Sequence, residues 1–221
     1  PRHALYEKRP LLLASIAAAL AYFVLRDAEL PELVPIAIKG CAVGLLAVYA
    51  WLVHSDRDGR LLVWVLGLAA CGDLAIEFDR QVGGWLFFGA HLVALALYLR
   101  NRREDLAATD KVVAAGLLLL TPAAAFLLPS DRAIAVQVGL YGLTLGAMAA
   151  CAWTSSFPRY RVGAGAAIFV VSDLLIFAGM GPLAESAIPY VLVWPCYYLA
   201  QFLICTGVLQ ALRRGSQRAR E

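Results

Sequence analysis

The sequence predicts an all-α integral membrane protein, a polytopic bundle of about eight transmembrane helices with both termini in the cytoplasm. Three observations predict this class: the composition, the spacing of the apolar segments and the distribution of charge between loops. Hydrophobic residues make up 62% of the 221 residues and charged residues only 16%, and the mean hydropathy is +0.73. Soluble domains are about half apolar and about one quarter charged, so the composition excludes a soluble fold.

Eight apolar segments follow one another along the chain, separated by charged residues or by Pro and Gly. Each approaches the roughly 20 residues that cross a bilayer core of about 30 Å, where a helix satisfies its own backbone hydrogen bonds. The loops between them are short, so we predict one integral membrane domain over residues 1–221. The predicted spans are 10–25, 33–53, 61–78, 82–99, 112–128, 133–153, 162–180 and 188–212.

Basic residues divide unequally between alternate loops. The N-terminus, the C-terminal tail and every second loop hold 15 of the 19 Lys and Arg residues, whereas the other loops hold only Arg26, Arg80 and Arg132. Cytoplasmic loops retain positive charge, so both termini are predicted to be cytoplasmic, in agreement with an even number of spans. The same loop bias accounts for the net charge of +3. We therefore expect no nucleic-acid partner.

A few polar side chains interrupt the apolar spans. A charge at the bilayer centre costs about 2.5 kcal/mol or more, so such residues normally face the bundle interior and carry function. From their depths we expect these side chains to converge in one pocket that opens toward the outer leaflet, because separate burial would cost each its own desolvation. They are Lys39, Asp73, His91, Ser172, Asp173 and Gln201, with Tyr98, Tyr197 and Tyr198 beside them.

Each of these polar residues can also be explained by a purely structural role. Lys39 lies close to a helix end, where a lysine can extend to the headgroups. Asp73, Asp173 and His91 can each bridge neighbouring helices, and Gln201 is the residue best suited to such structural bonding. Glu77 and Asp79 fall at the outer boundary, where solvation is the simpler expectation. The glycine pairs Gly40/Gly44 and Gly142/Gly146 predict close helix packing within the bundle.

Several of these residues together resemble the YhhN-like lysoplasmalogenase family of membrane hydrolases. The similarity extends from the second span to the eighth. The segment after Asp73 is more charged than that family's pattern, with Glu77, Asp79 and Arg80. The matching positions are Lys39, Gly72-Asp73, Phe87 or Phe88, His91, Tyr98, Ser172-Asp173 and the final segment YYLAQFLICTG at 197–207.

The resemblance implies hydrolysis of the vinyl ether bond of lysoplasmalogens to a fatty aldehyde and a glycerophospho-alcohol. A vinyl ether has no carbonyl for a serine to attack and is opened instead by protonation of carbon, which requires an acid and a nearby anion. Two carboxylates divide such roles in glycosidases. We therefore expect Asp73 and Asp173 to be the catalytic pair, His91 to relay the proton or orient water, and Lys39 to attract the phosphate or hold the ionised aspartate.

Further expectations concern binding residues, cofactors and location. Substrate contacts are expected from Lys39 and from Gln201, Tyr197, Tyr98 and Ser172. No metal or cofactor is expected, because the chain lacks the closely spaced ligands of a metal site, and the five cysteines show no C-x-x-C pairing. The expected partners are a lysophospholipid substrate and membrane lipids, in a multi-pass protein of the bacterial inner membrane.

Transport is the alternative function. Buried Asp, His and Lys residues also line the pathways of proton-coupled carriers and lipid flippases. Gly72-Asp73-Leu74 and Ser172-Asp173-Leu174 lie four predicted spans apart in parallel helices, as an internal repeat would place them. Release of aldehyde by purified protein in detergent, where no second compartment exists, distinguishes the two functions.

Overall fold

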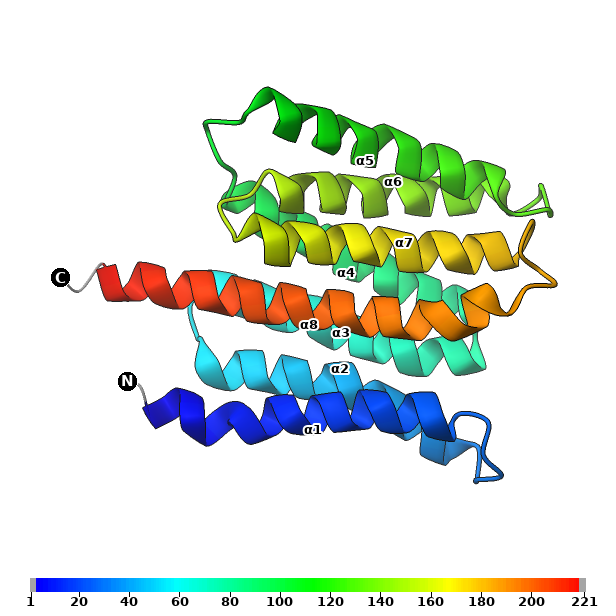
Figure 1. Cartoon of the computed structure of the whole chain (residues 1–221), viewed down its shortest axis with the longest axis horizontal. Coiled ribbons are helices and arrows are strands. Elements are labelled where there is room, and N and C mark those ends of the chain that lie inside the picture. The colour runs from blue at the N-terminus through cyan, green and yellow to red at the C-terminus, as the bar shows by residue number, and fades with distance from the viewer. Residues whose placement is uncertain (1–2, 219–221) are drawn as a thin grey trace. The chain divides into compact units, whose positions relative to one another are not determined.

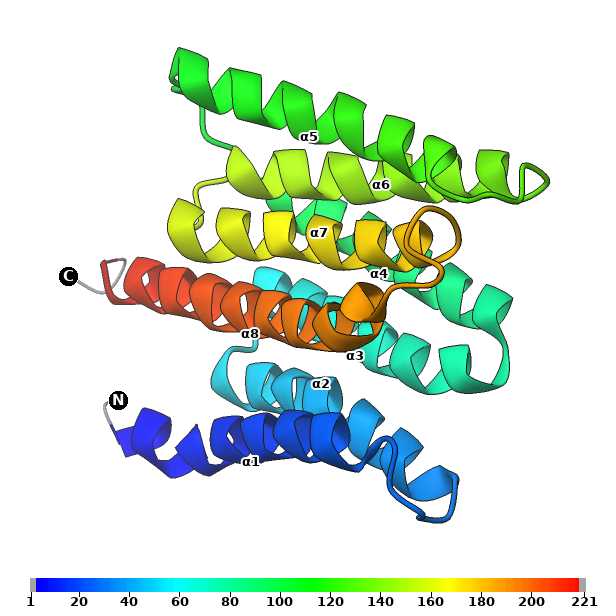
Figure 2. The same ribbon diagram turned by 45° about the vertical axis from the view of Figure 1, so that its right-hand side comes forward.

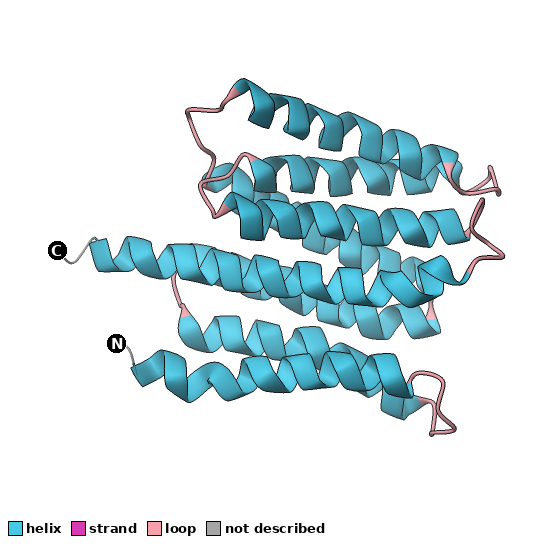
Figure 3. Ribbon diagram, viewed as in Figure 1, coloured by secondary structure: helices cyan, strands magenta, loops and turns pink. Residues whose placement is uncertain are grey.

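The computed structural model describes residues 3–218 and confirms the all-α class (Figures 1 and 3). Within these residues, helices are joined by short loops and there is no strand, only an isolated bridge between Arg102 and Ser155. The helices are α1 (His3–Leu25), α2 (Leu33–Val53), α3 (Arg57–Phe78), α4 (Arg80–Arg100), α5 (Ala108–Leu127), α6 (Ala135–Trp153), the π-helix η1 (Arg159–Gly163), α7 (Ala164–Gly179) and α8 (Ala187–Arg218).

Eight of the helices described in residues 3–218 are long and apolar enough to cross a membrane. The second predicted span, 33–53, coincides with α2. The largest differences are in the first and last helices. Helix α1 begins at His3 instead of at the predicted residue 10, and α8 continues to Arg218 beyond the predicted end at 212. The seventh span begins with a π-helical turn after Pro158. The chain is therefore a multi-pass integral membrane protein.

Aspartates define the ends of two membrane helices in the described chain. The side chain of Asp56 accepts a hydrogen bond from the backbone N–H of Gly59 at 2.7 Å and caps the N-terminus of α3. The Asp79 side chain accepts from the N–H groups of Gln81 and Val82 at 2.8 and 3.1 Å. Asp79 alone separates α3 from α4, so this cap lets the chain reverse without a longer loop.

Contacts divide the chain into two compact units: residues 1–94 with 208–221, and residues 95–207. In the first unit α1 lies against α2 and α2 against α3; in the second α5 lies against α6, as Figures 1 and 2 both show. Helices α4 and α8 each contribute residues to both units. The interpretation of residues 1–221 as a single membrane domain stays a prediction.

Glycines allow the closest helix contact, between α5 and α6. A Cβ atom at Gly142 would lie 2.5 Å from the Cβ of Ala125, and one at Gly146 would lie 2.5 Å from the carbonyl oxygen of Leu117. Real Cβ atoms essentially never come this close, so any larger residue would push the helices apart. The close-packing role predicted for the Gly142/Gly146 pair is confirmed within the described chain.

Candidate functional site

Lys39 and Glu77 form an ion pair within the first unit. Lys39 lies in the second turn of α2 and Glu77 in the last turn of α3, and Lys39 Nζ is 2.5 Å from Glu77 Oε1. The two helices approach closely here, because the side chain of Leu74 fills the space beside Gly40. The Lys39 side chain is 13% exposed and that of Glu77 33%, so the carboxylate is the more accessible partner.

Glu77 is exposed, as expected for a carboxylate at the boundary, and the ion pair gives it a partner that was not predicted, Lys39 of α2. Glu77 follows Asp73 by four residues, so both side chains lie on one face of α3. The i, i+4 spacing of Asp73 and Glu77 in the sequence indicates that the two acids share a helix face, but the position of Glu77 at the span boundary favoured simple solvation.

Tyr22 of α1 joins this cluster. The Lys39 ammonium lies 5.6 Å from the centre of the Tyr22 ring, within the range of a cation–π contact. Tyr22 is also within electrostatic range of Glu77, Arg26 and Asp73. Three helices of the first unit therefore bring charged and aromatic groups together in an otherwise apolar part of the chain. Sequence reasoning missed Tyr22, because one tyrosine in an apolar span carries no signal.

Asp73 and His91 are deeply buried in the same unit. Asp73 on α3 is 3% exposed and His91 on α4 is 2% exposed. The helices that carry them pack tightly, since a Cβ atom at Gly72 would lie 2.9 Å from the ring of Phe87. Gly72 precedes Asp73, and Phe87 lies one turn before His91. The close approach of α3 and α4 is thus at the level of both predicted catalytic side chains.

Asp173, on α7, is a buried carboxylate of the second unit that is hydrogen-bonded to a tyrosine. The hydroxyl of Tyr141 on α6 donates a hydrogen bond to Asp173 Oδ2 on α7 at 2.7 Å. The Tyr141 ring packs edge-to-face on Phe177, with the ring centres 5.8 Å apart. The neighbouring Ser172 hydroxyl donates to the carbonyl oxygen of Val193 on α8 at 3.0 Å. Tyr141 was not among the sequence-predicted residues.

Among the described residues of the second unit, five buried side-chain polar atoms have no hydrogen-bond partner, and two of these belong to predicted site residues. They are the hydroxyl of Tyr98 and Oε1 of Gln201. Gln201 Nε2 donates to the Tyr197 hydroxyl at the long distance of 3.5 Å. Buried polar groups are normally paired, so these two are candidates for contact with water or with a bound polar group. Tyr98, Tyr197 and Gln201 were all predicted as substrate-binding residues.

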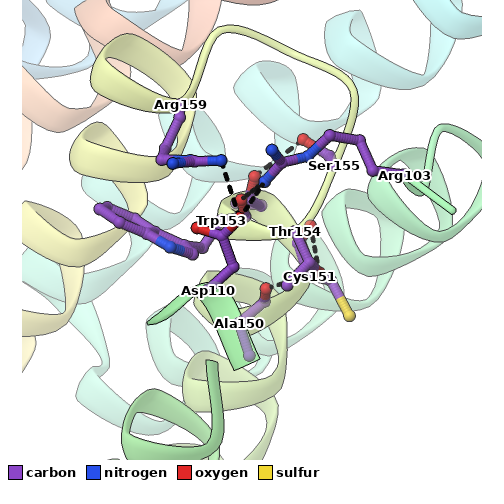
Figure 4. Close-up of polar contacts among 9 residues, drawn as sticks. Arg103, Asp110, Ala150, Cys151, Trp153, Thr154, Ser155 and Arg159 are labelled. Atoms are coloured by element: carbon purple, nitrogen blue, oxygen red, sulfur yellow. Dashed lines mark hydrogen bonds and ion pairs between the residues drawn. The ribbon is translucent and has the colours of Figure 1, made fainter. Parts of the chain in front are cut away.

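A second charged cluster joins the loop between α4 and α5, the first turn of α5 and the start of η1 (Figure 4). Asp110, 2% exposed, accepts from Arg159 at 2.8 Å and pairs with Arg103 at 3.6 Å. Arg103 also donates to the carbonyl oxygen of Trp153 at 2.9 Å. Each side chain here has a partner that connects one loop to the other, so the cluster fixes loop positions within the second unit.

The structure thus distributes the predicted site residues between the two units. Lys39, Asp73 and His91 belong to the first, and the others to the second. Their convergence into one pocket stays a prediction. Within the described residues, no three His, Cys, Asp or Glu side chains are grouped as metal ligands. The residues of the second unit are Tyr98, Ser172, Asp173, Tyr197 and Gln201.

Comparison with known proteins gives one match. A family model described as the YhhN family matches residues 34–208, from the second residue of α2 into the C-terminal half of α8. All the predicted site residues fall inside this range. No curated protein and no solved structure matches the chain.

Proposed function

Because the chain belongs to the YhhN family, we propose that it is a lysoplasmalogenase, a membrane hydrolase that cleaves the vinyl ether bond of lysoplasmalogens. The observation that carries this proposal is the burial of two carboxylates in helices otherwise suited to lipid. Asp73 and Asp173 are 3% and 5% exposed. Buried acids in membrane helices are expensive and mark sites of chemistry or transport.

The chemistry of the vinyl ether requires such a pair. A proton is added to the β-carbon, and the electrons of the double bond leave an oxocarbenium ion at the carbon attached to oxygen. Water attacks that carbon and loses a proton to give a hemiacetal, which collapses to the fatty aldehyde and the glycerophospho-alcohol. One aspartic acid supplies the first proton, and the other, ionised, stabilises the cation and receives the proton of water.

Other side chains near each aspartate or in the predicted site fit these two roles. Tyr141 fixes the orientation of Asp173 through its 2.7 Å hydrogen bond. His91, buried on the helix that packs against α3, orients the attacking water or relays a proton. Lys39 attracts the phosphate of the substrate. The unpaired oxygens of Tyr98 and Gln201 receive the glycerol part of the substrate or the attacking water.

The direct test is release of aldehyde from lysoplasmalogen by purified protein in detergent. Wild type is expected to be active, and Asp73→Asn and Asp173→Asn are expected to lose on the order of 10²- to 10⁴-fold in kcat, as is typical when a general acid or base is removed. Asp105→Asn, an exposed loop acid, serves as the matched control. A folded Asn variant with full activity would assign that aspartate a structural role only.

Transport of a lipid or of protons is the second candidate, favoured by the same buried Asp, His and Lys residues. A carrier moves its substrate between compartments and makes no product. Wild-type protein that releases no aldehyde in detergent, yet moves a fluorescent lysolipid across the bilayer of a proteoliposome, would replace the hydrolase proposal with this one.

A further inference from the structure

We propose that Glu77 determines headgroup specificity: its carboxylate, held beside Lys39, receives the cationic end of a zwitterionic phospholipid headgroup and disfavours anionic headgroups. The inference rests on the proposed function and adds to it a residue that selects among lysolipid headgroups. Its basis is the ion pair of the first unit, in which Lys39 Nζ lies 2.5 Å from Glu77 Oε1.

The charges of this cluster match a zwitterion. Lys39 carries one positive charge and Glu77 one negative charge. A headgroup phosphate that approaches Lys39 also meets the carboxylate of Glu77. Repulsion by Glu77 is offset only if the headgroup has its own ammonium to pair with that carboxylate. A net anionic headgroup lacks this compensation.

The position and the accessibility of Glu77 favour it as the group that contacts the headgroup and discriminates between headgroups. It is the penultimate residue of α3, at the end of a helix long and apolar enough to cross a membrane. Its side chain is 33% exposed, against 13% for Lys39. Only Oε1 is engaged by Lys39, so Oε2 can accept a further hydrogen bond. Lys39 likewise has three donors, of which Glu77 takes one.

The aromatic ring beside the ion pair fits the same ligand. Tyr22 lies 5.6 Å from the Lys39 ammonium, and its ring can also contact an alkylated ammonium of the headgroup. A hydrogen bond to Glu77 would favour a primary ammonium, whereas the ring would favour a quaternary one. The cluster therefore accepts both kinds of zwitterionic headgroup and excludes those without a cation.

The test compares Glu77→Gln with wild type on vinyl ether lysolipids that share one chain and differ only in headgroup. The headgroups are phosphoethanolamine, phosphocholine and phosphoglycerol. We expect kcat/KM for phosphoethanolamine to fall about tenfold, the loss of one hydrogen bond between charged groups, and kcat/KM for phosphoglycerol to be unchanged or higher. Glu32→Gln, an exposed acid without a side-chain cap bond at the start of α2, is the matched control and should leave the preference unchanged.

Equal loss on all three headgroups would overturn the inference, because Glu77 would then act only by holding Lys39. The same shift in Glu32→Gln would overturn it as well, as a general effect of surface charge. If wild type releases no aldehyde, the proposed function fails, but headgroup preference is still measured. Acyl lysophospholipids with the three headgroups, which lack the vinyl ether, are then tested as ligands by thermal stabilisation of both proteins in detergent. A Glu77→Gln variant with the wild-type order of stabilisation would contradict the proposal.

Discussion

The hydroxyl of Tyr141 determines how the carboxylate of Asp173 is presented. An aspartate side chain rotates about two bonds, and a 2.7 Å hydrogen bond to Oδ2 restricts that rotation. The ring that carries the hydroxyl is itself fixed by its edge-to-face contact with Phe177. A catalytic acid or base must be held in the productive geometry, so Tyr141 acts as a positioning residue for Asp173.

Tyr141→Phe is expected to lower kcat about tenfold, because it removes one hydrogen bond to a charged group, with KM little changed. The fold should persist, since the Phe177 contact involves only the ring. Steady-state aldehyde release measures both constants. Tyr160→Phe is the control, because Tyr160 is 81% exposed. An unchanged kcat in Tyr141→Phe would show that the bond does not position Asp173 for the reaction.

Lys39→Met is expected to raise KM more than it lowers kcat. A phosphate contact exists in both the ground state and the transition state, so its loss weakens binding uniformly. Lys111→Met, exposed in the first turn of α5, removes the same charge outside the cluster and should change neither constant. A large fall in kcat at constant KM would instead mean that Lys39 acts on the carboxylate chemistry of Asp73.

The buried aspartates were predictable, whereas some of their partners were not. Asp73 and Asp173 stand out because an ionisable residue in an apolar run is costly. Tyr141 and Tyr22 do not, because tyrosine is common in membrane helices and its partner is set by tertiary packing. Tyr141 lies 32 residues from Asp173 in the chain. Nothing in the local sequence indicates which helices will pack together.

At the scale of the helix, glycines set the distance between α5 and α6. Gly142→Ala is expected to destabilise the protein by about 1–3 kcal/mol, the usual cost of overpacking, because the new Cβ would lie 2.5 Å from that of Ala125. Thermal denaturation in detergent measures the effect. Gly67→Ala is the matched control, since no atom lies within 4 Å of its Cβ position, and it should be neutral or slightly stabilising. Equal stability of both variants would contradict this account.

Hydropathy predicts where the helices lie in the chain, but it does not always predict the residue at which a helix ends. An apolar run ends where the helix leaves the lipid, and the predicted span 33–53 agrees with α2 to the residue. Helix α8 continues to Arg218 because a polar tail can stay helical in water, where hydropathy gives no signal. The π-helix η1 was not predictable either. It begins after Pro158, next to a loop that is connected to the preceding one through Arg103 and Thr154.

At the scale of the whole molecule, the distribution of loop charge predicts the orientation in the membrane. Within the second unit, the loops 101–107 and 154–158 are joined by backbone hydrogen bonds, including one from Arg103 to Thr154. They must therefore lie on one side of the bilayer. Arg102 and Arg103 in the first loop, and Arg159 and Arg161 directly after the second, favour the cytoplasm for that side. A reporter that works only in the cytoplasm should be active when it is fused after residue 221, which lies outside the described residues. A reporter that works only outside the cytoplasm should be inactive at the same position. Reporter activity only outside the cytoplasm would contradict the predicted orientation.

The proposed mechanism requires Asp73 and Asp173 to act on the same substrate. Asp73 lies in residues 1–94 and Asp173 in residues 95–207. Hydropathy, the loop charges and the local motifs describe each unit alone, so sequence reasoning reaches the two acids separately. Their cooperation depends on packing between helices, and a functional measurement of coupling tests it directly.

The double variant Asp73→Asn/Asp173→Asn is expected to be little less active than the poorer single variant, because residues that act as a unit give non-additive losses. Each variant should insert and fold, since Asn keeps the shape of Asp and removes a costly charge. Wild-type turnover should also slow in D₂O, because the reaction transfers a proton to carbon. Aldehyde release in detergent measures all three rates, and Asp73→Asn combined with Asp105→Asn is the control, which should match Asp73→Asn alone. If the losses of Asp73→Asn and Asp173→Asn simply multiply, the two aspartates act independently, and the proposed two-carboxylate mechanism is wrong.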